Sequence, residues 1–433
     1  MTRRIVVILS ILMCCLYLID CGQKQQGDGD VAKVSFWYGF GGPLGESLEG
    51  MIADFNSAHP GIEVTGVSMG QYAALSQKIM AAIAANNPPT LAQVYENWTA
   101  NFIEAGAIVS MEEFIHGPKG FSQEDLEDIF PVFLEGGQFQ GQMWTFPFNK
   151  GLPAIYYNKE MFQAAGLDPE QPPQTWDEFR EMAARLTVDE DGKGRPEQWG
   201  TSFSIPTAFA MYQQMLVQNG GQIMSPDGRR FTFDSPQGVA ALQFLVDLVE
   251  KDGVAYIAPG AYEHQTDFVS RKVAMIQGYI VSRKYMEPQL TFQPGLAPVP
   301  RGDQKAVLIT GTNLAIFSRA SEAQQQAAWT FVKWLADVDQ QARWAVETSY
   351  VPIRRSALTS EIMQAEFDRV PGLEAVMRQM DYAHAQPKSA EWFAGRRQLQ
   401  EEAIETTLRG KLKAQEALQT AAEKLNRELT ESR

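Results

Sequence analysis

The sequence predicts an α/β protein, because segments with strand periodicity and segments with helix periodicity alternate along the chain. Its 433 residues are enough for two or three domains. Hydrophobic residues make up 45% of the chain and charged residues 21%, which is typical of a globular protein with real cores. Between residues 32 and 95 the order strand, helix, strand, helix, strand indicates right-handed βαβ units on a mostly parallel sheet.

The first of these elements is a strand over 33–38, where Val34, Phe36 and Tyr38 share one face. The elements that follow are a glycine-rich loop at 39–43, a helix ending at His59-Pro60-Gly61, a strand over 62–67, a helix ending before Asn86, and a strand over 91–95.

Capping signals predict three later helices. Thr175 with Glu178, and Ser321 with Gln324, are capping boxes in which each partner satisfies a free N–H of the first turn. Ser235-Pro236 places an N-cap and a first-turn proline before a third helix. The last predicted helix carries one apolar stripe, formed by Ala414, Leu418, Ala421, Leu425 and Leu429.

The N-terminus predicts export. Two arginines precede an apolar run over 5–19, which is typical of a signal peptide and too short to span a bilayer. We assign residues 1–20 to this signal. The sequence Leu18-Ile19-Asp20-Cys21 resembles a bacterial lipobox, although Asp20 replaces the usual small residue. We therefore expect lipidation at Cys21, with the polar, glycine-rich residues 21–31 as a flexible tether.

Charge and residue usage exclude several classes of function. A net charge of −15 disfavours binding to nucleic acid. All three cysteines lie in the first 21 residues, so the rest of the chain has neither a disulfide nor a thiol nucleophile. The four histidines form no close pair, and no cofactor-binding glycine motif is present, so we expect no metal and no cofactor. The acidic run at 189–194 lacks the ligand spacing of a calcium loop and is interpreted as a turn.

Aromatic residues indicate the kind of ligand. Several fall near predicted strand ends, where ligands of open α/β sheets bind, and aromatic faces pack against the C–H faces of sugars. These residues are Trp37, Tyr38, Phe40, Tyr72, Tyr95, Trp98, Trp144, Tyr279 and Tyr350. For each of them alone, core packing is the favoured explanation, but together they fit a carbohydrate-like cleft.

Several segments together place the chain near a known family. They are Gln93-Val94-Tyr95-Glu96, Pro147-Phe148-Asn149, Ile155–Lys159, the run Ala165–Pro173 with Thr175-Trp176, Tyr350–Ile353, and Gly410-Lys411 with Ala417-Leu418. From about residue 32 to 429 the chain resembles the periplasmic solute-binding proteins of ABC importers. Within them it is most similar to the branch that binds sn-glycerol 3-phosphate, a relative of the maltose-binding type.

The resemblance implies a type II fold of two lobes, each a mostly parallel sheet flanked by helices, joined by crossing strands at a hinge. Lobe 1 would comprise 32–147 and 296–345, and lobe 2 would comprise 148–295 and 346–433. It also implies a ligand held between the lobes, an ABC permease as partner, and no catalysis. We expect a monomer.

The resemblance carries a ligand set over to this chain position by position. Glu96 matches a carboxylate that accepts ligand hydroxyls, and Arg397 matches an arginine that faces the phosphate, although Arg396 is adjacent and could replace it. The remaining positions are Tyr72, Gly151, Tyr279, Gly311 and Tyr350. The family has serines where this chain has Gly151 and Tyr279.

The two missing hydroxyls leave the ligand open. Glycerol 3-phosphate, a glycerol phosphodiester and a mono- or oligosaccharide all stay candidates. Two other classes of function are weighed beside transport: a secreted carbohydrate-active hydrolase, and a surface lipoprotein without a transport role. In every case the protein acts outside the cytoplasmic membrane, in a periplasm or at a cell surface.

Overall fold

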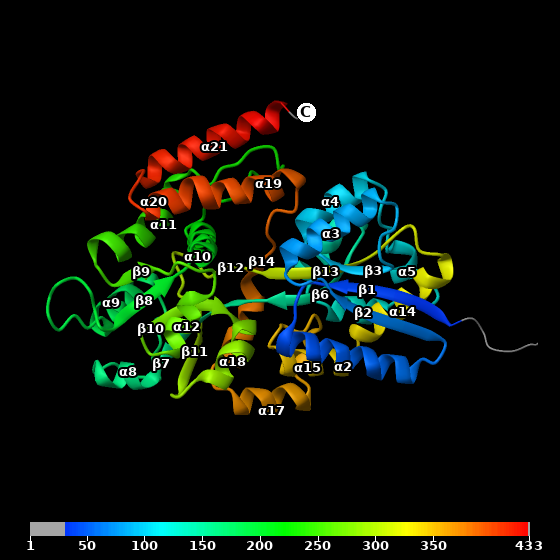
Figure 1. Ribbon diagram of the computed structural model, residues 1–433, viewed down its shortest axis with the longest axis horizontal. Coiled ribbons are helices and arrows are strands. Elements are labelled where there is room, and N and C mark those ends of the chain that lie inside the picture. The colour runs from blue at the N-terminus through cyan, green and yellow to red at the C-terminus, as the bar shows by residue number, and fades with distance from the viewer. Residues whose placement is uncertain (1–30, 432–433) are drawn as a thin grey trace, which may run out of the picture.

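Two five-stranded sheets, each with its own helices, form the two lobes of the protein in a computed structural model that describes residues 31–431 (Figure 1). The predicted signal peptide and the lipidation site at Cys21 lie outside the described residues. Lobe 1 holds, in spatial order, β2 (Ile62–Ser68), β1 (Ala32–Tyr38), β3 (Leu91–Val94), β13 (Thr310–Ile316) and β6 (Phe146–Gly151). Lobe 2 holds β11 (Pro294–Pro298), β7 (Pro153–Asn158), β10 (Val273–Tyr279), β8 (Trp199–Phe203) and β9 (Ala255–Ile257).

The two-lobe α/β fold is confirmed, but the strand directions are more mixed than predicted. In lobe 1, β1 pairs parallel with β2 and β3, whereas β13 pairs antiparallel with β3 and β6. Lobe 2 repeats this division, with β7 antiparallel to β10 and β11. The antiparallel pairings involve strands that enter or leave a lobe at the crossing. A parallel pairing requires a crossover connection, usually a helix, and these strands are not joined to their neighbours in that way.

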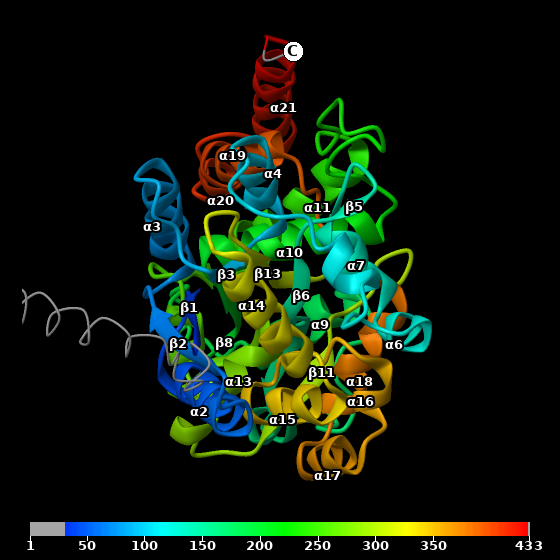
Figure 2. The same cartoon turned by 90° about the vertical axis from the view of Figure 1, so that its right-hand side faces the viewer.

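Helices cover both faces of the sheets. Around lobe 1 they are α2 (Gly42–Ala58), α3 (Tyr72–Ala84), α4 (Glu96–Glu104), α5 (Glu112–His116), α6 (Gln123–Asp128), α7 (Pro131–Gly137), α14 (Glu322–Leu335) and α15 (Val338–Thr348). Around lobe 2 they are α8 (Lys159–Ala164), α9 (Trp176–Leu186), α10 (Ile205–Gln218), α11 (Pro236–Val246), α12 (Glu263–Val269) and α13 (Arg283–Met286). Figure 2 shows α14 on the outer side of lobe 1, with α15 below it.

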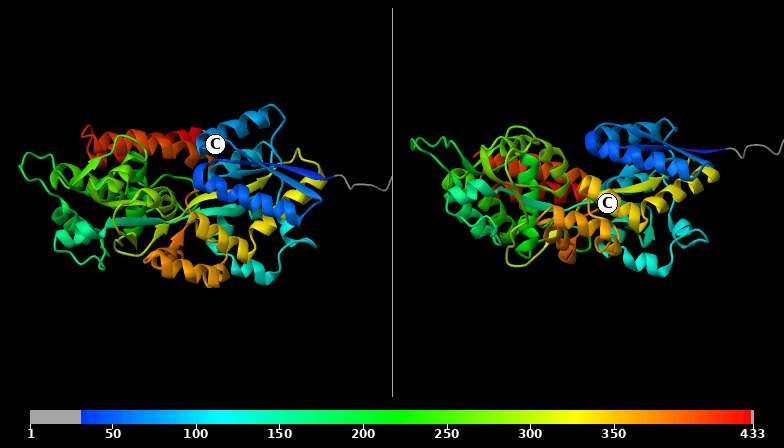
Figure 3. Two further views of the ribbon diagram at one scale, coloured as in Figure 1. Left: turned by 60° about the horizontal axis from the view of Figure 1, so that its bottom comes forward. Right: turned by 90° about the horizontal axis from the view of Figure 1, so that it is seen from below.

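The C-terminal part adds helices near the crossing and on lobe 2. These are α16 (Arg355–Leu358), α17 (Glu361–Arg369), α18 (Leu373–Met377), α19 (Ala390–Gln398), α20 (Thr406–Leu408) and α21 (Ala414–Glu431). Figure 3 shows this red C-terminal part beside the green helices of lobe 2, whereas the blue N-terminal part belongs to lobe 1. No helix within residues 31–431 is both long and apolar enough to cross a membrane.

Of the two predicted capping boxes, one is complete in the structure and the other is not. Ser321 and Gln324 form a complete capping box on α14. On α9 the box is incomplete: the Thr175 hydroxyl accepts from the Glu178 N–H, but the Glu178 carboxylate accepts from the Gln174 N–H instead. Gln174 directly precedes the N-cap Thr175, so the Glu178 carboxylate still satisfies a backbone N–H at the start of the helix.

The chain passes from one sheet to the other at the crossing, first from β6 to β7 and later from β11 to β13. β6 ends at Gly151 in the first sheet, and after Leu152 the chain enters β7 of the second. It returns through β11, β12 (Val307–Leu308) and β13, and β12 pairs with β14 (Ala383–His384). The sheets thus divide the chain at 151–153 and 298–310.

A buried ion cluster fixes the crossing on one side. Arg283 of α13 donates to the Ser349 hydroxyl (2.8 Å) and to the Glu366 carboxylate of α17 (2.6 Å). Both charged side chains are almost fully buried. Ser349 adopts φ +66°, a conformation that serine rarely takes, so the Arg283 contact holds a turn that directly precedes Tyr350.

Candidate ligand-binding site

Four of the seven predicted ligand residues lie at the ends of strands from both lobes. Glu96 begins α4 just after β3, Gly151 ends β6, Tyr279 ends β10, and Gly311 is the second residue of β13. Gly151 pairs with Thr310, and a Cβ placed on Gly151 would lie 3.8 Å from the Tyr279 ring. The crossing strands therefore bring these positions from separate parts of the chain to one place, which holds the carboxyl ends of β3, β6 and β10 and the amino end of the antiparallel β13.

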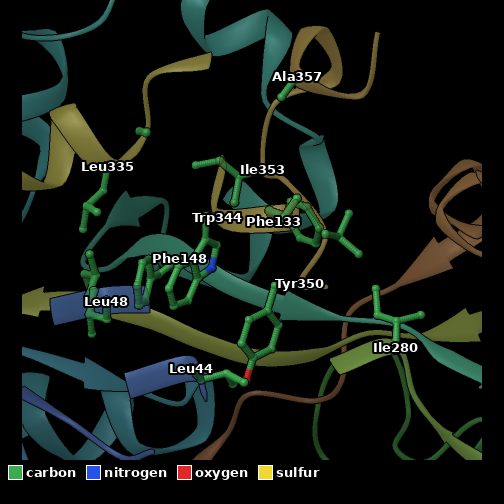
Figure 4. Packing of buried hydrophobic residues seen from close by; sticks show 14 of the residues in the cluster. Leu44, Leu48, Phe133, Phe148, Ile280, Leu335, Trp344, Tyr350, Ile353 and Ala357 are labelled. Carbon is green, nitrogen blue, oxygen red and sulfur yellow. The ribbon is translucent and has the colours of Figure 1, made fainter. Parts of the chain in front are cut away.

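Tyr72 and Tyr350 form one side of the site. Their hydroxyls are 3.3 Å apart, and the Asn149 amide donates to the Tyr72 hydroxyl at 2.9 Å. The Tyr350 ring stacks on Trp344, which in turn stacks on Phe148 (Figure 4). Burial raises the pKa of Tyr350 to about 12 and that of Tyr72 well above its usual value. Both phenols are therefore neutral at physiological pH and can donate or accept hydrogen bonds.

Glu96 is tied to a buried lysine. The Lys150 ammonium donates to Glu96 Oε1 at 2.5 Å. The Lys150 side chain is 1% exposed, whereas that of Glu96 is 23% exposed. Glu96 Oε2 accepts no hydrogen bond from the residues that the structure describes, so the carboxylate can accept a ligand hydroxyl while its other oxygen neutralises Lys150.

Gly311 and Gly151 differ in whether the structure requires glycine at their positions. Gly311 has φ +139°, and a Cβ there would come within 2.0 Å of the Asn149 carbonyl oxygen, so only glycine fits. At Gly151 an added Cβ would meet its neighbours at ordinary van der Waals distances of 3.7 Å or more. Glycine is therefore required at position 311 by the backbone, whereas position 151 has room for a small side chain.

The arginine that faces the site is Arg396, not Arg397. The Arg397 side chain is 79% exposed and pairs with Glu401. Arg396 lines a narrow slot together with Glu96 and Tyr95. Burial raises the pKa of the Tyr95 and Tyr279 hydroxyls, and the Arg396 charge opposes that rise, since the guanidinium lies beside both phenols. Successive residues of a helix point about 100° apart, so only one of two adjacent arginines can face the cleft.

Arg396 is also free to bind a ligand. Among the described residues no carboxylate lies within ion-pair distance of it; its guanidinium lies 5.8 Å from the Phe209 ring centre. Two other polar groups in the slot residues are buried without a partner: Asn97 Oδ1 and the Trp392 indole N–H. Unpaired buried polar groups are rare and often mark a place where a ligand or water completes the hydrogen bonds.

Sequence reasoning missed Lys150 as the partner of Glu96, and also missed Asn149 and Trp392. A signal for Lys150 was present, because it is a lysine in the otherwise uncharged strand Phe146–Gly151, and a buried lysine requires a carboxylate. No sequence signal pointed to Trp392. The run at 189–194 forms a turn closed by Asp189 and Gly194, and no cluster of metal-binding side chains occurs among residues 31–431.

Comparison with known proteins gives one family. Residues 50–370 match the model of the family described as bacterial extracellular solute-binding proteins. The chain is also 27% identical, over 91% of its length and 90% of the relative, to the sn-glycerol-3-phosphate-binding periplasmic protein UgpB of Pectobacterium atrosepticum.

Solved structures share the fold. A cyclic α-maltosyl-1,6-maltose binding protein from Arthrobacter globiformis matches with a TM-score of 0.79 and 24% identity, over 92% of this chain and 99% of that one. UgpB from Mycobacterium tuberculosis in complex with glycerophosphocholine matches with a TM-score of 0.79 and 21% identity, over 94% and 99%.

The Glu96–Lys150 pair leads to a stability prediction. Replacing Glu96 by glutamine leaves a buried ammonium without its counter-charge, so the free energy of unfolding should fall by about 3 kcal/mol. The double variant Glu96→Gln/Lys150→Met should recover most of that loss. Urea unfolding without ligand measures both, with the exposed Glu401→Gln as control. Equal stability of Glu96→Gln and wild type would show that the pair does not support the fold.

Proposed function

Because the chain belongs to the bacterial extracellular solute-binding proteins, we propose that it captures a small polar solute between its lobes and delivers it to the permease of an ABC importer. The observation that carries this proposal is the meeting of Tyr95 and Glu96 with Arg396, from distant parts of the chain, in one slot beside the crossing strands. A ligand that touches both lobes favours their closed arrangement. The family is one of binding proteins, so the protein is not an enzyme.

We infer that the solute is a glycerol phosphate, a glycerol phosphodiester or a sugar. The similarity to sn-glycerol-3-phosphate-binding proteins supports the first two. The free Arg396 guanidinium supports them as well, since an arginine fork suits a phosphate. A sugar is supported by the solved relative that binds a cyclic maltosyl-maltose, and by the two serines that this chain lacks at positions 151 and 279.

Glycerol 3-phosphate, a glycerophosphodiester and neutral saccharides should be compared by thermal shift, because a solute that binds only the native state raises apparent stability. Incubation of the same solutes with pure protein, followed by product analysis, separates binding from turnover. Saturable binding without product supports the proposal. Product formation would favour the hydrolase class, and the absence of any shift would favour a surface lipoprotein without a transport role.

The two adjacent arginines provide a matched test of the phosphate. Arg396→Ala should weaken binding of glycerol 3-phosphate by at least tenfold, because a hydrogen bond to a charged group contributes roughly 1.5–3 kcal/mol. It should also reduce the salt dependence of binding. Arg397→Ala, which removes an exposed cation of the same helix, should change the affinity little. Calorimetry measures both, and equal losses in the two variants would contradict the assignment of Arg396.

A substitution at position 151 tests the effect of the serine hydroxyl that this chain lacks there. Gly151→Ser fits the space beside Thr310 and Tyr279 without a close contact, so the variant should fold normally. If the phosphate lies at this position, the new donor should strengthen glycerol 3-phosphate binding by roughly tenfold. Gly151→Ala, which adds the carbon without the hydroxyl, is the control. Unchanged binding of glycerol 3-phosphate by Gly151→Ser would mean that the phosphate lies elsewhere.

We further propose that the mature protein is anchored by lipid at Cys21. The support is the apolar segment before it and the polar tether after it. Two or more acyl chains give stable membrane attachment. Cys21→Ser should therefore move the protein from the membrane fraction to the soluble fraction of cells, as measured by fractionation and immunoblotting. An unchanged distribution would argue against lipidation.

A further inference from the structure

A second cavity lies beside the proposed ligand site, with walls from both lobes. Its lobe 1 wall comes from the loop at 39–44 and the start of α3, and its lobe 2 wall comes from α12 and the segment 281–289. Tyr72 and Tyr350 line it, and the Tyr72 ring packs edge-on against Tyr95, which lines the slot that holds Glu96 and Arg396. We call this cavity the chamber. Its volume is about 830 Å³, against about 20 Å³ for the slot.

The difference in volume matters for the size of the ligand. A space of about 20 Å³ holds about one water molecule, whereas ligand pockets usually measure about 300–1,000 Å³. In this arrangement of the lobes the slot can therefore hold only a small part of a solute. The bulk of the solute has room in the chamber.

The chamber is uncharged. None of the residues that line it is an aspartate, glutamate, lysine, arginine or histidine, although the chain as a whole carries a net charge of −15. The polar groups are neutral amides and hydroxyls, which include Gln71, Gln265, Gln289, Ser68, Thr266 and Ser282. Such groups both donate to and accept from ligand hydroxyls.

Aromatic rings are exposed at the chamber's lobe 2 wall. Tyr262 is 67% exposed and Tyr285 is 41% exposed, and they are the exposed large aromatic side chains among the described residues. The Tyr285 hydroxyl donates to the Gly41 carbonyl of lobe 1 at 3.3 Å. Gly41 and Gly70 have open space where a Cβ would stand, so the wall opposite the tyrosines leaves room for a ring.

We propose that the chamber is a second subsite that takes the neutral, polyhydroxylated ring of a saccharide, with Tyr262 and Tyr285 stacking on it. This inference rests on the proposed function, since it assigns part of the solute that the protein captures. Aromatic faces match the C–H faces of a sugar, and the amides match its hydroxyls. A quaternary ammonium group would also suit tyrosines, but it has no hydroxyls and would leave the amides of the chamber unpaired.

The inference predicts a ligand larger than glycerol 3-phosphate and a specific dependence on the two exposed tyrosines. The probes are glucose, maltose, maltotriose and glycerophosphocholine, titrated by calorimetry into wild-type protein. For the saccharide that binds most tightly, Tyr262→Ala and Tyr285→Ala should each weaken binding by roughly tenfold. Tyr285→Phe keeps the ring but loses the contact with Gly41, and should stay within roughly threefold of wild type.

The controls separate the subsite from the rest of the protein. Tyr382→Ala removes a half-buried tyrosine that lines neither cavity and should leave saccharide binding unchanged. Circular dichroism and thermal unfolding check that each variant is folded. A loss in Tyr285→Phe as large as that in Tyr285→Ala would assign the effect to the contact between the lobes and overturn the stacking role.

Failure of this inference can be told apart from failure of the proposed function. Saccharide binding that all the tyrosine variants retain would overturn the subsite and leave solute capture intact. Binding of glycerophosphocholine alone, lost in the alanine variants, would assign the chamber to a quaternary ammonium group and overturn the saccharide. Wild-type protein that binds none of the four probes overturns the saccharide subsite; if it also binds no solute in the thermal-shift comparison, the proposed function fails with it.

Discussion

The ion pair between Lys150 and Glu96 is the constraint on which the site depends. Lys150 lies in β6, a strand whose six residues are all buried, and it sits where that strand leaves lobe 1. A buried ammonium is tolerated only with a counter-charge, and Glu96 at the start of α4 supplies it. The orientation of the carboxylate is therefore fixed before any ligand arrives, and only its exposed side remains free to bind.

Tyr350 and Tyr72 are also held in position by other residues of the protein. Tyr350 follows a serine with φ +66°, and the Arg283–Glu366 pair holds that turn from lobe 2. Its ring lies on Trp344, and its hydroxyl meets that of Tyr72. Side chains that are held by packing and by second contacts lose little freedom when a ligand binds, so more of the contact energy appears as affinity.

The slot and the chamber differ in charge as well as in size. The narrow slot has a carboxylate, a free guanidinium and two unpaired polar groups, whereas the chamber has tyrosines, amides and hydroxyls. This division fits a solute with one strongly polar end and one neutral ring.

The sequence by itself determined the class of fold and the order of the first strands and helices. Local periodicity and caps were sufficient for this, because β1, α2, β2, α3 and β3 are each specified by neighbours along the chain. The identification of Tyr72, Glu96, Tyr279 and Tyr350 came from resemblance to a family and not from their spacing.

Only the tertiary structure decided that Arg396 and not Arg397 faces the cleft, since that depends on how α19 is rotated against its neighbours. It also decided that Glu96 pairs with Lys150, and that Tyr262 and Tyr285 face the loop at 39–44. These contacts join residues far apart in the chain, and their partners follow from how strands cross between the lobes, which no local pattern specifies.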